Sequence, residues 1–126
     1  MTDQMTARIA MVTLDVAEVE PSADFWSALL GWEVAASTDD YAMLTGPDGS
    51  PALGLGRTDD FEAPSWPDTG RKQFHLDLAV DDIEAMAGRA VELGARLVDP
   101  QPGETWKVLL DPAGHPFCLT DAKNWG

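Results

Sequence analysis

Cysteine and positive charge are both scarce in this sequence. Its 126 residues contain one cysteine and eight basic side chains, against 22 acidic ones. A single cysteine cannot close an internal disulfide or build a thiolate zinc cluster, so a secreted disulfide scaffold and a zinc finger are excluded. The net charge of −14 argues against nucleic acid and anionic membranes as partners. It leaves a cationic ligand open, although a solvated acidic surface accounts for the same charge.

Long apolar runs and two common catalytic motifs are also missing. No stretch approaches the ~20 apolar residues of a membrane span, and the segment MTDQMTARIAMVTLDV lacks a basic region followed by an apolar one. We therefore expect a soluble, cytoplasmic protein. The glycines of GPDGSPALGLG are not followed by a lysine, which argues against a phosphate-binding loop. The nucleophile elbow of serine hydrolases does not occur either.

What the sequence does contain is an internal repeat. Residues 11–34 align with residues 75–98 when a gap is placed before the glycines Gly31 and Gly94. Further on, YAMLTGPDGSPALGL aligns with WKVLLDPAGHPFCLT, and both contain a Pro-x-Gly-x-Pro turn. A strand, a helix end and a turn that match at one period indicate two copies of one structural unit.

Each copy predicts a strand, a helix and then two or three further strands, which is a βαβββ module. An alternating apolar run predicts the first strand, and apolar residues at helical spacing follow it. Ser22 in the first copy, and Asp81 or Asp82 in the second, are predicted to cap the helix N-terminus. Gly31 and Gly94 are predicted to end the helices, at a position where φ is often positive.

The length suits one domain that contains both modules. Module one is expected at about residues 7–57, a polar linker rich in Pro and Gly at about 58–72, and module two at about 73–121. Because neither module alone buries enough apolar surface, the two should share one core or pair across a dimer.

Alternation along the strands separates a helix-facing side from an opposite side. The helix-facing residues of the first strands are all apolar: Val12, Leu14, Val16, Leu76, Leu78 and Val80. The opposite side is mixed: Met11, Thr13, Asp15, His75, Asp77 and Ala79. In the last strands, Cys118 and Thr120 are assigned to this mixed side, and the aligned turns assign Leu53 and Leu55 to the same places in the first copy. A half-polar sheet face is typical of a ligand cleft.

In these segments the chain resembles the vicinal oxygen chelate superfamily of glyoxalase-like, bleomycin-resistance-like and dioxygenase-like proteins. MVTLDV followed by SADFWSALLGWEV, FHLDLAVDDIEA and DPAGHPFCL carry the resemblance, which runs from about Arg8 to Asp121. It implies an α+β fold in which two βαβββ modules form a cupped mixed sheet around a cleft, with the helices on the outer face. It also implies a homodimer.

The resemblance places Met11, Leu53, His75 and Cys118 at the four positions that hold a divalent metal in metal-dependent relatives. His75 is a proper ligand and Cys118 stands where a glutamate is common, but the other two cannot hold a hard ion. Because a histidine and a thiolate alone are too few, zinc would need a further donor such as Asp77 or a ligand atom. We therefore expect no cofactor. A divalent ion (Zn, Fe, Mn or Ni) on His75 and Cys118 is the alternative.

Several side chains are candidates to bind a small, cationic or aromatic molecule: Thr13, Asp15, His75, Asp77, Trp66, Trp106, Cys118 and Thr120. The two tryptophans are candidates for stacking. A contact between His75 and Asp77 is geometrically allowed, and Cys118 is more often a small buried hydrophobe than a nucleophile.

Other notable residues have structural interpretations. Trp26 and Trp32 are expected to pack in the core, whereas Trp125 could cover the cleft or a dimer partner. His115 is expected to be exposed in its turn, and Asp111 and Gly114 are expected to form that turn. No catalytic residue is assigned.

Three functions remain open at this point. The favoured one is a metal-independent protein of the glyoxalase/bleomycin-resistance type that binds a small molecule in the cleft. The second is a metal-dependent lyase, isomerase or dioxygenase that uses His75, Cys118 and carboxylates such as Asp15, Asp77 or Glu104. The third is a protein-interaction module with a vestigial cleft.

Overall fold

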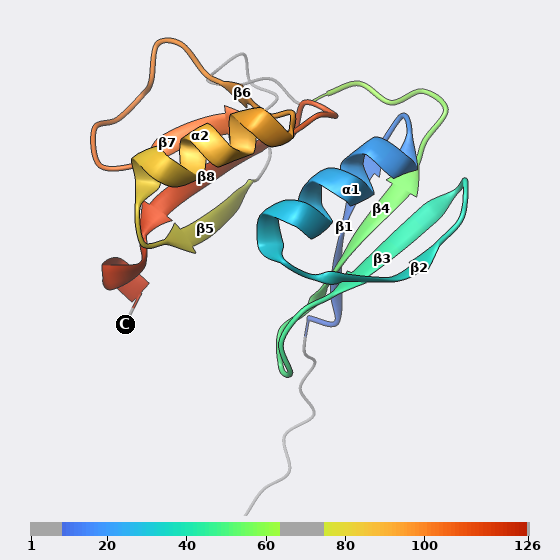
Figure 1. Cartoon of the computed structure of the whole chain (residues 1–126). Helices are drawn as coiled ribbons and strands as arrows, with labels where there is room; N and C mark the ends of the chain where they lie inside the picture. The colour runs from blue at the N-terminus through green and yellow to red at the C-terminus, as the bar shows by residue number, and fades with distance from the viewer. Residues whose placement is uncertain (1–8, 64–74, 126) are drawn as a thin grey trace, which may run out of the picture.

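The computed structural model describes residues 9–63 and 75–125, and these form two βαβββ modules (Figure 1). Trp66 and most of the expected linker lie outside the described residues. Module one comprises β1 (Met11–Val16), α1 (Val19–Leu30), β2 (Glu33–Ser37), β3 (Tyr41–Thr45) and β4 (Ala52–Arg57). Module two comprises β5 (Leu76–Val80), α2 (Ile83–Leu93), β6 (Arg96–Leu97), β7 (Lys107–Leu110) and β8 (Pro116–Asp121), and the 3₁₀ helix η1 (Ala122–Trp125) follows. The predicted α+β class is confirmed.

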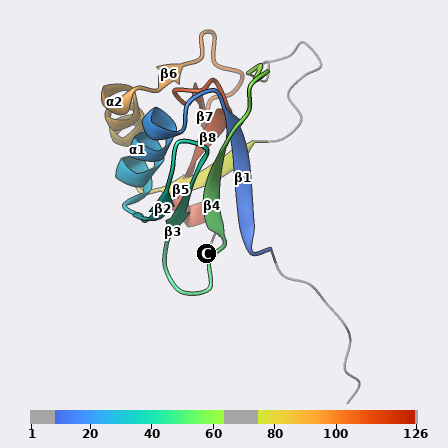
Figure 2. The same cartoon turned by 90° about the vertical axis from the view of Figure 1, so that its right-hand side faces the viewer.

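The two modules have the same strand order in two separate four-stranded sheets, β1-β4-β3-β2 and β5-β8-β7-β6. In each, the first strand pairs in parallel with the last, and the other pairs are antiparallel. The sheets are therefore mixed, as predicted. The two helices lie on the same side of the molecule (Figure 2), where the Arg89 guanidinium donates to the Ala28 carbonyl at 3.4 Å. Among the described residues, neither helix is long and apolar enough to cross a membrane.

The helix C-termini follow the sequence prediction, but one N-terminus does not. Gly31 and Gly94 end the helices with φ of 71° and 119°, which glycine adopts without strain. Asp82 caps α2, its carboxylate accepting from the Ala85 amide at 3.0 Å. The prediction for Ser22 was wrong: α1 begins at Val19, and Ser22 is buried inside the helix. Pro21 does not prevent this earlier start, because the amides of the first turn lack helical partners anyway.

Replacing Asp82 by alanine is expected to lower the free energy of unfolding by about 1 kcal/mol, because one amide of the first turn loses its acceptor. Chemical denaturation would measure the loss. Asp81→Ala, which removes the same charge one residue earlier and is also exposed, should have almost no effect. Equal losses in the two variants would show that charge, rather than capping, is responsible.

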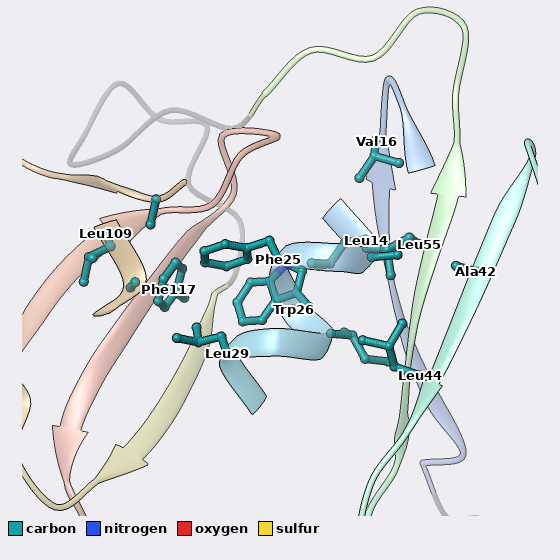
Figure 3. Close-up of a cluster of buried hydrophobic side chains, with 14 of the residues drawn as sticks. Leu14, Val16, Phe25, Trp26, Leu29, Ala42, Leu44, Leu55, Leu109 and Phe117 are labelled. Atoms are coloured by element: carbon teal, nitrogen blue, oxygen red, sulfur yellow. The ribbon is translucent and has the colours of Figure 1, made fainter. Parts of the chain in front are cut away.

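One hydrophobic core joins the two modules, and α1 lies at its centre between the sheets (Figure 3). Phe25 and Trp26 stack edge-on with ring centroids 5.1 Å apart, and Trp26 lies 5.0 Å from Phe117 of β8. Leu14, Leu44 and Leu55 line the opposite side of the same helix in module one. The modules therefore share a core, and the packing roles predicted for Trp26 and Trp32 are confirmed.

A turn between β7 and β8 fastens this core by hydrogen bonds. We call residues 111–115 the latch turn. Asp111 is 1% exposed, and its Oδ2 accepts the Trp26 indole N–H at 2.8 Å, whereas its Oδ1 accepts two amides of the turn itself, those of Ala113 and His115. A buried carboxylate with three donors is satisfied. The turn role predicted for Asp111 is confirmed, and the structure adds a link to module one.

His115 provides a second link and corrects a prediction. It was expected to be exposed, but it is half-buried, and its Nε2 lies 2.6 Å from the backbone carbonyl of Asp15. Because a carbonyl oxygen can only accept, Nε2 carries the proton. The imidazole also contacts the Phe61 ring at a centroid distance of 5.4 Å. The latch turn therefore contacts module one through both Asp111 and His115.

Candidate functional site

The helix-free face of each sheet, opposite the face that packs on its helix, contains the predicted site residues of β1, β5 and β8 and His75, which precedes β5. In module one, β1 pairs with β4 so that Thr13 lies beside Gly54, and Leu14 beside Leu55. Leu53 and Leu55 are 4% and 1% exposed and belong to the core. Their predicted place on the helix-free face was therefore wrong.

The error comes from the length of one turn. Residues 45–52 separate the paired Leu44 and Leu53 in module one, whereas residues 110–116 separate the paired Leu109 and Phe117 in module two. The first turn is thus one residue longer. Aligning the two turns shifts β4 by one position relative to β8, and a one-residue shift moves every side chain to the other face.

Gly54, rather than Leu53, is the residue that corresponds to Cys118. A Cβ on Gly54 would lie 2.8 Å from Thr13 Oγ1 and 3.0 Å from Met11 Sδ, so these two side chains lie over the glycine on the helix-free face. Met11 is 46% exposed there. At the two module-one positions that correspond to metal ligands in the relatives, the protein therefore has Met11, whose donor is a thioether, and Gly54, which has no side chain.

Module two brings three donor side chains together on its helix-free face. Asp77 pairs with Cys118 across β5 and β8, and the His75 Nε2 lies 3.3 Å from Asp77 Oδ1. One ligand atom from each of His75, Asp77 and Cys118 lies within 4.8 Å of the other two. The side chains of His75 and Asp77 are 27% and 44% exposed, whereas Cys118 is 3% exposed. The predicted sharing of one face, and the allowed His–Asp contact, are both present.

A hard divalent ion held jointly by both modules does not fit this donor set. Mg²⁺, Mn²⁺ and Fe²⁺ require several oxygen or imidazole ligands. Met11 and Gly54 supply none, and the remaining acid of β1, Asp15, is exposed near the end of the strand. Module one therefore lacks the donors that it would contribute to the metal position of the metal-dependent relatives.

Thr120 lies on the same face but its hydroxyl is already engaged. It donates to the Leu78 carbonyl at 2.8 Å and accepts the Trp125 indole N–H at 2.8 Å. Trp125 is 63% exposed, and η1 contacts both β5 and β8. The terminal tryptophan thus packs beside the helix-free face of module two, and it, rather than the Thr120 hydroxyl, offers surface to a ligand.

Trp106 lies just before β7. It is 37% exposed, and its indole packs so closely on Gly103 that a Cβ there would lie 2.3 Å from Cη2. Gln101 fixes the same loop, because its amide exchanges hydrogen bonds of 2.8 and 2.9 Å with the backbone of Val108. No periodic pattern in the sequence indicates this role of Gln101. Glu104 in the same loop is exposed.

Comparison with known proteins identifies solved structures that share this fold. The solved structures of a glyoxalase/bleomycin resistance protein/dioxygenase family enzyme from Burkholderia phytofirmans (TM-score 0.72, 15% identity, covering 92% of this chain and 99% of that one) and of Leishmania major glyoxalase I (TM-score 0.69, 18% identity, 95% and 90%) are similar. Residues 11–120 match the glyoxalase-like domain family, and the chain belongs to it. The resemblance to the vicinal oxygen chelate superfamily is confirmed.

A third similar structure is a bleomycin-binding protein from Streptomyces verticillus in complex with copper(II)-bleomycin (TM-score 0.60, 19% identity, covering 94% of this chain and 98% of that one). At these identities the likeness extends to the fold alone. No curated protein matches the sequence significantly.

Proposed function

We propose that the protein binds a small organic molecule on its helix-free faces, without a catalytic metal shared between its two modules. The observation that carries this proposal is the pair Met11 and Gly54, which replaces both expected metal donors of module one. The same observation weighs against a metal-dependent lyase, isomerase or dioxygenase. Membership of the glyoxalase-like domain family supports binding, as does the bleomycin complex of one structural neighbour.

The chemistry of the two faces favours a ligand that is cationic or aromatic. Asp15 and Asp77 are exposed carboxylates on the helix-free faces, one from each module. Trp106 and Trp125 are partly exposed, which suits stacking or cation–π contact. The net charge of −14 attracts cations over a longer range.

We also propose that the functional unit is a cytoplasmic homodimer in which residues 1–126 form one domain. Within the described residues, β1 and β5 each pair on one side only, so each sheet has an unpaired edge beside the candidate residues. Unpaired edges are sites where another chain adds. Sedimentation equilibrium would test the dimer, and a monomer at all concentrations would contradict it.

Binding is testable by tryptophan fluorescence, because Trp125 packs beside the helix-free face of module two and Trp106 is partly exposed. Chelator-treated protein titrated with a panel of cationic aromatic compounds should give a saturable change. Asp77→Asn is expected to weaken a cationic ligand by about tenfold, because one charge-assisted contact is lost.

The matched control is Asp24→Asn, which removes one charge from the exposed side of α1. It should leave the affinity unchanged. Equal weakening in the two variants would mean that overall charge, and not this site, attracts the ligand. A panel that produces no fluorescence change would contradict the proposal itself.

A further inference from the structure

We propose that an open space over Gly56 on the helix-free face of module one, between Asp15 and Tyr41, holds an alkylated ammonium group of the bound molecule. We call the space between these three residues the Gly56 gap. The inference rests on the proposed binding function and deepens it, because it names the charged group that is recognised and the residues that recognise it.

The three residues form one row across the sheet of module one. Gly56 of β4 pairs with Asp15 of β1 on one side and with Tyr41 of β3 on the other. Their side chains belong to the helix-free face, because the adjacent residues Ala42 and Leu55 belong to the core. Strands lie about 4.8 Å apart, so the Cα atoms of Asp15 and Tyr41 are roughly 10 Å apart. The residue between them has no side chain.

The space over Gly56 is open in the described part of the chain. Apart from its neighbours in sequence, a Cβ there would meet one atom within 4 Å, which is Thr13 Cγ2 at 3.5 Å. Gly54 differs, because a Cβ there would lie 2.8 Å from Thr13 Oγ1. The Thr13 methyl group therefore closes one end of the Gly56 gap. The exposed Asp15 and the 49% exposed Tyr41 lie on its two sides.

The second module provides a comparison within the same molecule. Thr120 takes the place of Gly56 in the corresponding row. Its partner on the first strand is Ala79, where module one has Asp15. The Thr120 hydroxyl accepts the Trp125 indole N–H at 2.8 Å. Because both rows support the same strand pairing, the fold alone does not require an acid beside a glycine, and this combination is particular to module one.

The backbone on both sides of the gap is held by hydrogen bonds. The Asp15 carbonyl accepts from the His115 imidazole at 2.6 Å. The Tyr41 amide donates to Thr38 Oγ1 at 3.1 Å, and the Tyr41 carbonyl accepts from the Thr38 amide at 2.7 Å. A site whose sides are already fixed loses less conformational entropy when a ligand binds.

The charges around the gap favour a cation. Within the described residues, the Asp15 carboxylate enters no ion pair, and the guanidinium of the neighbouring Arg57 is paired with Asp59 at 3.0 Å. A cation midway across the gap also lies within about 6 Å of the Tyr41 ring, which is the range of a cation–π contact. The gap therefore offers a cation one carboxylate and one aromatic ring.

The scarcity of acceptors selects the kind of cation. A primary ammonium has three N–H donors to satisfy, whereas the gap is bounded by one carboxylate, one phenol ring and one methyl group. A hard metal ion would need several oxygen ligands. A quaternary or tertiary ammonium has neither requirement, and its methyl groups can contact the ring and the Thr13 methyl. The gap is therefore suited to an alkylated ammonium.

Choline provides the direct test, together with the uncharged alcohol in which a tert-butyl group replaces the trimethylammonium group. The two molecules share one shape and differ in charge. In an NMR titration of the isotopically labelled full chain, choline should shift the amide signals of Thr13, Tyr41 and Gly56 in a saturable way. The uncharged alcohol should bind at least about tenfold more weakly, because it makes neither the ionic nor the cation–π contact.

Gly56→Ala fills the gap at little cost to the fold. The φ of Gly56 is not positive, and the new Cβ would lie at an ordinary contact distance from Thr13. The variant should bind choline at least about tenfold more weakly, because the Cβ occupies the space of the ligand. Its free energy of unfolding should not fall, since glycine weakens a strand. Gly88→Ala, on the exposed side of α2, is the matched control and should leave the affinity unchanged.

Two further residues are tested by removing what each contributes. Asp15→Asn should weaken choline by about tenfold, because the ionic contact is lost. Tyr41→Leu should weaken it by about threefold, whereas Tyr41→Phe keeps the ring and should keep the affinity.

Four results would overturn the inference: no saturable shift with choline, equal binding of the uncharged alcohol, wild-type affinity in Gly56→Ala, or shifts confined to module two. Failure of the proposed function is a separate outcome, because the fluorescence titrations use aromatic compounds and follow tryptophans of module two. A fluorescence response without choline binding would leave the proposed function standing and refute the Gly56 gap.

Discussion

Replacing Asp111 by alanine is expected to lower the free energy of unfolding by about 3–4 kcal/mol, because it leaves three donors without their acceptor. Two of these donors are amides of the latch turn, and the third is the indole of Trp26, which is 0% exposed. The loss should appear in chemical denaturation as a lower midpoint with an unchanged slope.

The two oxygens of Asp111 allow the turn and the link between modules to be separated. Oδ1 accepts the amides of Ala113 and His115, whereas Oδ2 accepts the Trp26 indole. Asp111→Asn can keep the Oδ1 contacts while presenting an N–H₂ group to the indole. Trp26→Phe removes the indole N–H instead. The double variant should then cost clearly less than the sum of the two, because both single changes break the same bond.

Additive losses in this double-mutant cycle would contradict the role assigned to the bond. They would mean that Trp26→Phe acts through the volume it removes from the core and that Asp111→Asn acts through the turn. Because Trp26 also contacts Phe25 and Phe117, some loss from packing is expected in either case. The coupling energy, and not the size of either single loss, is the decisive quantity.

This bond also shows where prediction from sequence stops. The sequence identified both of its ends separately: Trp26 as a core residue and Asp111 as a turn former. The residues are 85 positions apart, and no local pattern links them. Pairing them requires knowing that α1 packs against the β8 side of module two. Internal repetition predicts that two modules exist, but it carries no information on how they dock.

The part of the candidate site that depends on strand alternation alone could be predicted from the sequence. Alternation in the sequence placed His75 and Asp77 on one face and Cys118 on the same face. The structure agrees, because Cys118 of β8 pairs with Asp77 of β5. In module one the same logic failed at Leu53, because the assignment depended on a turn that is one residue longer than its counterpart. Alternation assigns residues to a sheet face reliably within one strand. The assignment can be carried from one repeat to the other only when the connecting turns have equal lengths.

The second large loss of stability is expected from a substitution in one of the two Pro-x-Gly-x-Pro turns, and the other turn provides the control. Gly49 and Gly114 occupy the same place in their turns, with φ of 89° and 97°. Alanine is strained at either position, at a cost of about 1–2 kcal/mol. Around Gly49 a new Cβ would meet nothing within 4 Å, whereas at Gly114 it would lie 2.6 Å from the Cβ of Ala63. Gly114→Ala should therefore cost about 3–4 kcal/mol, because overpacking adds to the strain.

The difference between Gly114→Ala and Gly49→Ala measures how tightly the latch turn packs on the segment that contains Ala63, just after β4, since the backbone strain is nearly the same in both. Adding Ala63→Gly to Gly114→Ala removes the clashing Cβ and should bring the loss back to that of Gly49→Ala. Unfolding free energies of these three variants and of the wild type give the comparison. If Gly114→Ala and Gly49→Ala lower the free energy of unfolding equally, the segment containing Ala63 moves away from the new Cβ without a loss of stability. The contact between the latch turn and module one would then rest on the Trp26–Asp111 and Asp15–His115 bonds alone.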